Sequence, residues 1–339
     1  MDEIEVEIVT MTGFKKFLIV TASVIAGLFL ISVVGGFIFV GHYLNKMKRV
    51  NNEVDTVSPE DEDFETDENN GLDILDPDSI LWNPVTSDPA ALAGSRMMNF
   101  LLIGQDRRPG EGRQRSDAMI VCSVNPASKK VAMVSFLRDL YVQIPGYTDN
   151  RLNAAYAFGG FRLLKQTLYV NFGISVDGCF EVDFTGFKTL IDEIDGIDIT
   201  LTAAEAKRIG KGTVEGVNHM NGERALAYAR IRKIGTDFAR TNRQRTVLMA
   251  AYQKVKGKSP SELLRLLEDT LPFITTDMSN ADIYATAMKL FPMVRSVEIG
   301  SYYIPPDNAY SNVYIRGMAV LLPDLEKIRQ LLWNEYLPR

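Results

Sequence analysis

The chain has 339 residues, of which 46% are hydrophobic and 24% charged, and this length and composition support a full hydrophobic core and exclude a wholly disordered protein. The net charge of −6 is unevenly spread, because residues 1–49 carry +1, residues 50–95 hold thirteen acidic and no basic residues, and residues 96–339 carry +6. A basic body favours an anionic ligand such as a phosphate. Two cysteines at wide spacing exclude a disulfide framework and a cysteine metal cluster.

The amino-terminal region predicts a membrane anchor. Residues 17–40 contain no charged side chain, and a helix of this length, at about 1.5 Å per residue, crosses a hydrocarbon core of roughly 30 Å. The run is long for a signal peptide or a buried core helix, and no typical cleavage site follows it. We therefore predict a short cytoplasmic tail over residues 1–16 and a single transmembrane helix over residues 17–41. Basic residues flank both ends, so charge alone leaves the orientation open.

An acidic stretch separates this anchor from the rest of the chain. It contains the run SPEDEDFETDENNG and several prolines. A segment this polar, with charges of one sign, buries too little apolar surface to offset its ordering entropy. We therefore predict a disordered linker over residues 42–95 that holds the following domain away from the membrane.

Residues 96–339 show the patterns of a globular domain. Short apolar runs predict buried strands at 98–104, 118–124 and 131–137, and the NPASKK between the last two predicts a hairpin turn. Further strands are predicted at 196–202 and 297–304, and helices at 153–170, 184–194, 222–230, 239–255, 261–271, 280–291 and 322–333. Because the sequence shows no internal repeat, one α/β body with helices packed on a mixed sheet is the expected architecture.

Acidic and arginine side chains gather where the first three strands meet one edge of this sheet. Short connections favour antiparallel neighbours, so the end of strand one, the start of strand two and the end of strand three share that edge. The side chains there are Asp106, Arg107, Arg115, Asp117, Arg138 and Asp139. Asp106 and Asp117 could hold a hard divalent cation while the arginines bind phosphate oxygens. Ordinary surface salt bridges are the alternative explanation for each pair taken alone.

A second basic cluster follows the helix predicted at 222–230. Its members are Arg230, Arg232, Lys233, Asp237, Arg240, Arg243, Gln244 and Arg245. Asp237 is a plausible N-cap, which puts Arg240 in the first helical turn with Arg243 and Gln244 on the same face. Cations at a helix N-terminus oppose the helix dipole by a few tenths to about 1 kcal/mol each, and a bound phosphate would explain them. The alternative is a solvated basic face paired with nearby acids.

Several kinds of site are excluded. His42 and His219 are the only histidines, and no phosphate-binding G-x-x-x-x-G-K-[ST] loop occurs. A Ser-His-Asp triad or a histidine-rich metal site would have to depend on His219 alone. Cys122, in an apolar strand, is predicted to be a core residue and not a nucleophile.

Four blocks of sequence together resemble the LytR-CpsA-Psr family of bacterial cell-envelope proteins: NFLLIGQDRR, RSDAMIVCSVNPASKKVAMVSFLRDLYVQIPG, RLNAAYAFGG and MNGERALAYARIRKIGTDFARTNRQR. The resemblance covers about residues 98–255. It implies a three-layer α/β/α domain with a central mixed sheet over residues 96–339, in which residues 259–339 pack on that core. The domain would lie on the extracellular face of the cell membrane, held there by the single span.

The resemblance also implies a function and its residues. It predicts a magnesium-dependent phosphotransferase that moves a glycopolymer, such as teichoic acid or capsule, from an undecaprenyl-pyrophosphate carrier onto peptidoglycan. Asp106 and Asp117 would bind Mg²⁺. The pyrophosphate would be bound by Arg107, Arg138, Arg230, Arg232, Arg240, Arg243 and Gln244. In place of the proline that is usual in the family before the RD pair, this chain has Leu137.

The residues leave several alternatives open. Asp139 or Asp237 could deprotonate the acceptor hydroxyl, and the sequence does not choose between them. A hydrolase of polyprenyl pyrophosphates would need the same site, with water as the acceptor. A non-catalytic regulator that binds the lipid carrier is the third candidate. Nucleic acid is not expected as a partner, because the sequence has no convincing helix-turn-helix.

Overall fold

The computed structural model describes residues 41–50, 64, 66–85, 97–105, 113–210, 212–231, 234–235, 237–293 and 297–338, with backbone only at 237, 260 and 291. The chain divides into two compact units, Met1–Lys46 and Met47–Arg339. In the first unit residues 41–44 form a helical turn, whose Gly41 carbonyl accepts from the N–H of Asn45 at 3.0 Å. The predicted tail and residues 17–40 of the predicted span lie outside the described ranges. Within those ranges no helix has the length and apolar character that crossing a bilayer requires.

The second unit is built on a seven-stranded mixed sheet. Its strands, in order across the sheet, are β1 (Lys48–Arg49), β11 (Ile274–Thr276), β8 (Gly178–Asp183), β3 (Met98–Gln105), β4 (Ser116–Asn125), β5 (Lys130–Phe136) and β12 (Glu298–Ile304). Strands β3, β4 and β5 are antiparallel neighbours, as predicted, whereas β8 and β12 run parallel to β3 and β5. The Asn125 side chain accepts from the N–H of Ala127 at 3.0 Å and so forms the predicted turn between β4 and β5.

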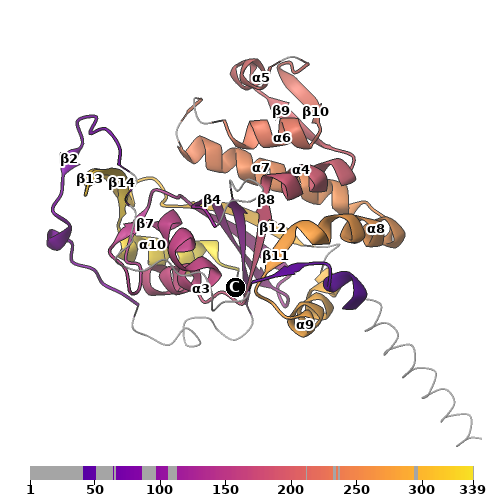
Figure 1. Ribbon diagram of the computed structural model, residues 1–339, viewed down its shortest axis with the longest axis horizontal. Coiled ribbons are helices and arrows are strands. Elements are labelled where there is room, and N and C mark those ends of the chain that lie inside the picture. The colour runs from indigo at the N-terminus through magenta and orange to yellow at the C-terminus, as the bar shows by residue number, and fades with distance from the viewer. Residues whose placement is uncertain are drawn as a thin grey trace, which may run out of the picture. The chain divides into compact units, whose positions relative to one another are not determined.

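Helices cover both faces of this sheet (Figure 1). One face carries α3 (Leu152–Phe172) and α10 (Leu325–Leu331), and the other carries α4 (Phe184–Glu193), α6 (Gly222–Ala229), α7 (Asp237–Lys256), α8 (Pro260–Thr270) and α9 (Asn280–Leu290). Alternation along the strands sends Leu101, Val121 and Val134 to the α3 face, where each is fully buried. The predicted α/β architecture with a mixed central sheet is confirmed.

Helix α3 is kinked at a pair of glycines. Gly160 has φ +60°, in the left-handed region, and a Cβ there would lie 2.9 Å from the Arg113 side chain. The helix predicted for this segment is therefore interrupted at its middle, and the kink makes room for an arginine that donates to the carbonyl of Ala157 at 3.1 Å. Glycine is the residue that meets both requirements without strain.

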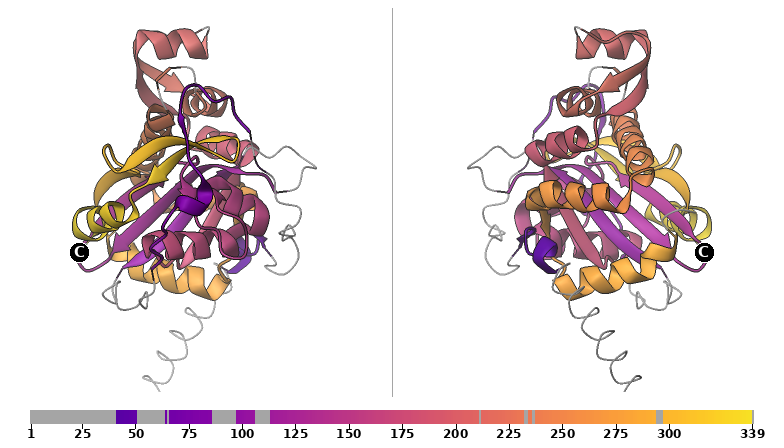
Figure 2. Two further views of the ribbon diagram at one scale, coloured as in Figure 1. Left: turned by 90° about the vertical axis from the view of Figure 1, so that its left-hand side faces the viewer. Right: turned by 90° about the vertical axis from the view of Figure 1, so that its right-hand side faces the viewer.

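A small projection lies at one end of the unit, beyond α6 and α7 (Figure 2). It consists of α5 (Ala203–Ile209) and the antiparallel pair of β9 (Ile197–Leu201) and β10 (Gly216–Met220). The strand predicted at 196–202 is thus present, but it pairs with β10 and not with the central sheet. Thr202 and Glu205 form a capping box that fixes the start of α5.

Over the described part of residues 42–95, the structure differs from the predicted disordered linker. Residues 48–49 form the edge strand β1, and residues 66–85, which we call the strap, pack on the body. Within the strap β2 (Asp73–Ile74) pairs in parallel with β13 (Tyr310–Ile315), which pairs with β14 (Met318–Pro323). Trp82 stacks on Tyr141 and donates to the Asp149 carboxylate at 2.6 Å. The sequence did not reveal these apolar contacts, because the average composition of the stretch is polar.

The carboxyl-terminal part is integral to the fold. Strands β11 and β12 lie in the central sheet, while β13 and β14 hold the strap. The remaining short elements are β6 (Tyr141–Val142), β7 (Asn150–Arg151), the 3₁₀ turns Pro77–Ser79, Leu271–Phe273 and Phe291–Met293, and the π-helical turn Leu332–Tyr336. Cys122 and Cys179 are both free thiols, so neither forms a disulfide.

Candidate functional site

A cavity of about 360 Å³ lies between the sheet and the helices α4, α6 and α7. It is lined by Leu102, Ile103, Gly104, Asp117, Ala118, Ile120, Phe180, Val182, Phe184, Phe187, Leu190, Ile191, Leu226, Ala229, Arg230, Arg240, Gln244, Val247, Leu248, Ala251 and Ile274. Nearly all of these residues are apolar, and this lining suits an apolar ligand.

Strand alternation builds the sheet side of the cavity. Leu102 pairs with Ile120 on β4 and with Phe180 on β8, so all three side chains point to the same face. At the end of β3 the pairing register shifts, because Gly104 pairs with Ala118 but Gln105 pairs with Ser116. Asp117 is the extra residue of this β-bulge and lines the cavity beside Ala118. Bulges of this kind commonly redirect one side chain at a functional site.

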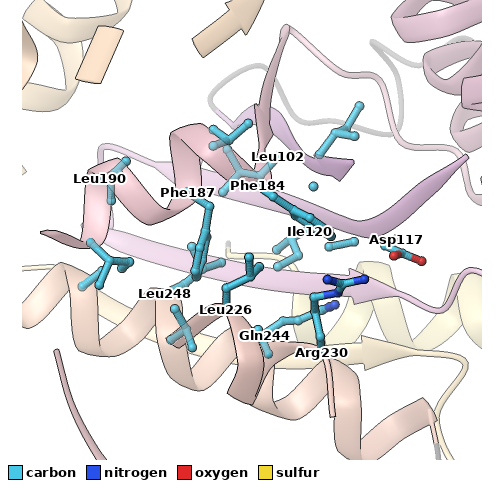
Figure 3. A pocket seen from close by; sticks show the side chains of 18 of the residues that line it. Leu102, Asp117, Ile120, Phe184, Phe187, Leu190, Leu226, Arg230, Gln244 and Leu248 are labelled. Carbon is cyan, nitrogen blue, oxygen red and sulfur yellow. The ribbon is translucent and has the colours of Figure 1, made fainter. Parts of the chain in front are cut away.

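The helical side of the cavity comes from the three helices α4, α6 and α7. Phe187 and Leu190 on α4 are one turn apart, as are Gln244 and Leu248 on α7. Figure 3 shows Leu190 and Leu248 at the end of the cavity away from Asp117. Helix α6 contributes Leu226, which Figure 3 shows nearer to Gln244. The deep part of the cavity therefore contains hydrocarbon side chains.

The polar lining residues are gathered at one end, which we call the mouth: Asp117, Arg230, Arg240 and Gln244. Figure 3 shows Arg230 and Gln244 close to Asp117. Arg230 ends helix α6, and its guanidinium carbon lies 4.4 Å from the centre of the Phe184 ring, which holds the charge over an aromatic face. Arg240 is only 3% exposed and lies one turn before Gln244 on α7, so the predicted shared face of these two residues is present.

Arg138 and Asp139 extend the mouth beyond the cavity. Nη1 of Arg138 lies 3.2 Å from Oδ1 of Asp117, and its Nε lies 3.5 Å from Oδ2 of Asp139. The predicted convergence of strand ends at one sheet edge therefore occurs for Asp117, Arg138 and Asp139. The side chains of Asp117 and Arg138 are each 21% exposed, so a ligand at the mouth can reach them.

Arg243 does not line the cavity, although its position in the sequence had suggested the pyrophosphate site. Its Nε donates to Glu205 at 2.7 Å, and its other two nitrogens donate to the carbonyls of Ile231 and Ile234 at 3.1 and 2.8 Å. Burial opposes ionisation of Glu205, but hydrogen bonds from Thr202 and Arg243 outweigh burial and hold the pKa of this carboxyl below its usual value. Arg243 thus ties α7 to the projection.

Three predicted site residues, Asp106, Arg107 and Arg232, lie outside the described residues, as does the side chain of Asp237. Helix α7 begins at Asp237 and not one residue after it, and whether its carboxylate caps the helix stays a prediction. Asp106 directly follows Gln105 in the sequence, and Gln105 pairs with the neighbour of Asp117.

Asp117 is the one carboxylate among the lining residues of the cavity that could hold a divalent cation. Over the part of the chain that the structure describes, no three His, Cys, Asp or Glu side chains are grouped to hold a metal. Asp117 has the oxygen chemistry that Mg²⁺ prefers, and Mg²⁺ commonly takes one or two carboxylates together with phosphate oxygens and water. The described donors therefore fit a magnesium ion that a phosphate ligand helps to hold.

Sequence patterns did not identify the apolar lining of the cavity. Phe184, Phe187, Leu226 and Leu248 lie on helical faces that would ordinarily be assigned to the core. A possible signal was the excess of large apolar residues on three helices that cover one sheet face. The complete arrangement, an apolar chamber with a cationic mouth, can bind an amphiphile with an anionic head group.

Known proteins resemble this chain in sequence and in fold. The sequence model of the LytR_cpsA_psr family matches residues 61–334. "Regulatory protein MsrR" of Staphylococcus aureus is 32% identical over 220 residues, which are 64% of this chain and 67% of MsrR. "Polyisoprenyl-teichoic acid--peptidoglycan teichoic acid transferase TagT" of Bacillus subtilis is 32% identical over 235 residues, 64% of this chain and 72% of TagT. A solved structure of TagT "with bound octaprenyl pyrophosphate lipid" has a TM-score of 0.55 and 26% identity, over 74% of this chain and 93% of that chain.

Proposed function

The chain belongs to the LytR_cpsA_psr family, and from this premise we propose that it is a phosphotransferase that attaches a glycopolymer from a polyprenyl-pyrophosphate carrier to peptidoglycan. The observation that carries the proposal is the apolar cavity of about 360 Å³ with a mouth of arginines and Asp117. A polyprenyl pyrophosphate has the same division into hydrocarbon and anion. The bound lipid in the TagT structure supports this match.

The donor would bind with its prenyl chain in the cavity and its pyrophosphate at the mouth. Arg230 and Arg240 would contact the phosphate oxygens from the cavity side, and Arg138 from the edge of the sheet. Arginine suits this role because its fork of donors matches the geometry of phosphate oxygens. Gln244 would add a neutral hydrogen bond.

The transfer itself would be a substitution at phosphorus. The acceptor hydroxyl oxygen forms a bond to the phosphorus that carries the sugar, and the bond from that phosphorus to the bridging oxygen breaks. Polyprenyl phosphate leaves with the electron pair, and a base takes the hydroxyl proton. Positioning and charge neutralisation supply most of the acceleration in reactions of this kind. The arginines at the mouth would stabilise the charge that develops on the bridging oxygen.

Asp139, one of the two bases that the sequence offered, is held in ion pairs. One of its oxygens lies 3.5 Å from Arg138 and the other 3.5 Å from Arg151. Both oxygens of Asp139 are therefore engaged by guanidinium groups in the described structure. Asp237 stays a prediction, because its side chain lies outside the described part of the chain.

We include magnesium in the proposal, held by Asp117 together with Asp106. When bound, the ion would neutralise part of the pyrophosphate charge. Arg138 lies 3.2 Å from the Asp117 carboxylate and would keep it oriented toward the mouth. We also propose that the domain lies on the extracellular face of the cell membrane, anchored by the apolar run at residues 17–40.

The test uses the full chain in detergent with a short-chain polyprenyl-pyrophosphate glycan and peptidoglycan fragments, with and without Mg²⁺. Sugar phosphate should appear on the acceptor only when Mg²⁺ is present. Release of free sugar phosphate alone would indicate a hydrolase, and binding without turnover would indicate a non-catalytic regulator. A chain that binds no polyprenyl pyrophosphate would refute all three.

A further inference from the structure

A series of oppositely charged side chains, each in contact with the next, leads from the mouth of the cavity to the strap. Asp117 contacts Arg138 at 3.2 Å, and Arg138 contacts Asp139 at 3.5 Å. The other oxygen of Asp139 lies 3.5 Å from Nε of Arg151, and Nη2 of Arg151 pairs with the carboxylate of Asp67. Asp67 belongs to the strap, so a residue in the acidic stretch is connected to the site by three further charged side chains.

Asp67, the last of these charged side chains, is held firmly by hydrogen bonds. Its backbone N–H donates to the carbonyl of Gly317 at 2.8 Å, and its own carbonyl accepts from the hydroxyl of Tyr314 at 2.8 Å. Its carboxylate also accepts from the N–H of Ala319 at 2.9 Å. These contacts fix Asp67 to the β13–β14 hairpin, so its charge has a defined position.

The same hairpin holds the loop that carries Arg138 and Asp139. The N–H of Leu321 on β14 donates to the carbonyl of Asp139 at 2.9 Å, and Leu321 also bridges to Leu140. Arg151 donates to the carbonyl of Ala319 at 2.9 Å. The backbone of this loop is therefore fixed by β14, while the direction of its two charged side chains depends on their ionic contacts.

Arg151 is the central group of the arrangement, because its side chain is only 5% exposed. A buried guanidinium needs carboxylates close to it, and Arg151 has one on each side, Asp67 and Asp139. Without Asp67, Asp139 would have to compensate Arg151 alone. Asp139 would then turn toward Arg151 and away from Arg138, whose guanidinium would lose one of the carboxylates that orient it.

We propose that Asp67 is a positioning residue for pyrophosphate binding, acting through Arg151 and Asp139 on Arg138. The inference depends on the proposed function, because Arg138 must contact the pyrophosphate for its orientation to matter. It gives the strap a role in the site, and it assigns Asp139 to orientation and not to proton transfer.

The test compares binding of two probes to the full chain in detergent, geranylgeranyl pyrophosphate and geranylgeraniol, by titration calorimetry. Asp67→Asn removes the charge at nearly constant shape and should weaken pyrophosphate binding about tenfold, the effect of losing one well-oriented charged contact. Binding of the alcohol, which depends on the apolar cavity, should stay within about twofold. Asp73→Asn, on the exposed strand β2 of the same strap, is the control and should bind both probes as the native chain does.

The outcomes separate the inference from the proposed function. Equal binding of both probes by the native chain would refute the proposed function and with it the inference. A native preference for the pyrophosphate that Asp67→Asn leaves unchanged would overturn the inference alone. An equal loss of both probes in Asp67→Asn would also overturn it, since that result means general loosening of the fold.

A double-mutant cycle tests whether Arg151 carries the effect. Arg151→Lys keeps the charge, but a single ammonium cannot replace a fork that contacts Asp67 and Asp139 with different nitrogens. If both residues act through one chain of contacts, the double variant should lose about as much pyrophosphate affinity as the more impaired single variant. Additive losses would overturn the inference.

Discussion

Arginines one turn apart on α7 have different surroundings and therefore different expected roles. Arg240 lines the mouth of the cavity, whereas Arg243 pairs with Glu205, 38 residues earlier in the chain. We predict that Arg240→Met lowers kcat/KM for the transfer about a hundredfold, because an electrostatic contact to the reacting phosphates is lost. Steady-state assays of the full chain would measure this loss. Near-native activity would contradict the assignment of Arg240 to the donor site.

Arg243→Met, in contrast, should lower the stability of the fold. The substitution leaves the largely buried Glu205 without its guanidinium partner, with side-chain exposures of 6% for Arg243 and 11% for Glu205. Breaking one side of such a pair costs about 3 kcal/mol in the free energy of unfolding. Urea unfolding would measure the loss, and Arg240→Met serves as the matched control on the same helix. Native stability of Arg243→Met would contradict the structural role.

The same carboxylate predicts a pH dependence of stability. The pKa of Glu205 is lower in the folded chain than its usual value of about 4.3. Its contribution to stability is therefore complete above about pH 4.3 and disappears as the pH falls through the lower, folded value. Between neutral pH and acid, the native chain should lose more stability than Glu205→Gln, which cannot titrate. Parallel loss in both chains, measured by urea unfolding, would contradict this.

Sequence spacing predicted which residues share a helical face, but not which distant group each one meets. Gln244 follows Arg240 by one turn, and both reach the mouth as expected. Arg243 was expected there by the same reasoning, yet Glu205, on a separate projection, lies close enough to pair with it. Arg243 and Gln244 differ because the i+3 and i+4 positions point in different directions around a helix. The neighbours that pack against each position then decide which charged group its side chain meets.

At the scale of elements the strap is the main difference from expectation. Trp82→Ala should lower the free energy of unfolding by about 2 kcal/mol, because the indole stacks on buried Tyr141 and donates to Asp149. Leu81→Ala is the matched control. Leu81 is 96% exposed, so its loss should change stability by less than about 0.5 kcal/mol. Equal effects of the two substitutions on urea unfolding would mean that the strap does not pack on the body.

The order of the elements explains which parts of the fold were predictable. Strands β3, β4 and β5 follow one another with short connections, and their antiparallel pairing was expected for that reason. Strand β1 pairs with β11, from more than 200 residues later, and β2 pairs with β13 at a similar distance. A strand of two residues is too short to show an alternating pattern in the sequence. Such strands can therefore be recognised only in the folded structure, where their partner strands lie beside them.

At the scale of the whole molecule, the fold separates a charged mouth from an apolar chamber. The sheet edge supplies Asp117 and Arg138, the helices supply Arg230, and strands and helices together supply the hydrocarbon lining. Neither surface alone distinguishes a lipid pyrophosphate from other ligands, since arginines bind any phosphate and apolar cavities accept many hydrocarbons. Under the proposed function, their junction would confer selectivity for a lipid pyrophosphate, because both halves of one amphiphile must fit at once.

This division predicts that the binding of the prenyl chain can be altered independently of the binding of the pyrophosphate head group. Leu248 lies at the end of the cavity away from Asp117, and Leu248→Trp should fill that end (Figure 3). Binding of octaprenyl pyrophosphate should weaken about tenfold, the usual effect of excess bulk in an apolar pocket, while geranyl pyrophosphate should bind within about twofold of native. Gln253→Trp, on the exposed side of the same helix, is the control. Because a short chain occupies only the part of the cavity next to the mouth, equal weakening of both lipids would mean that the prenyl chain lies elsewhere.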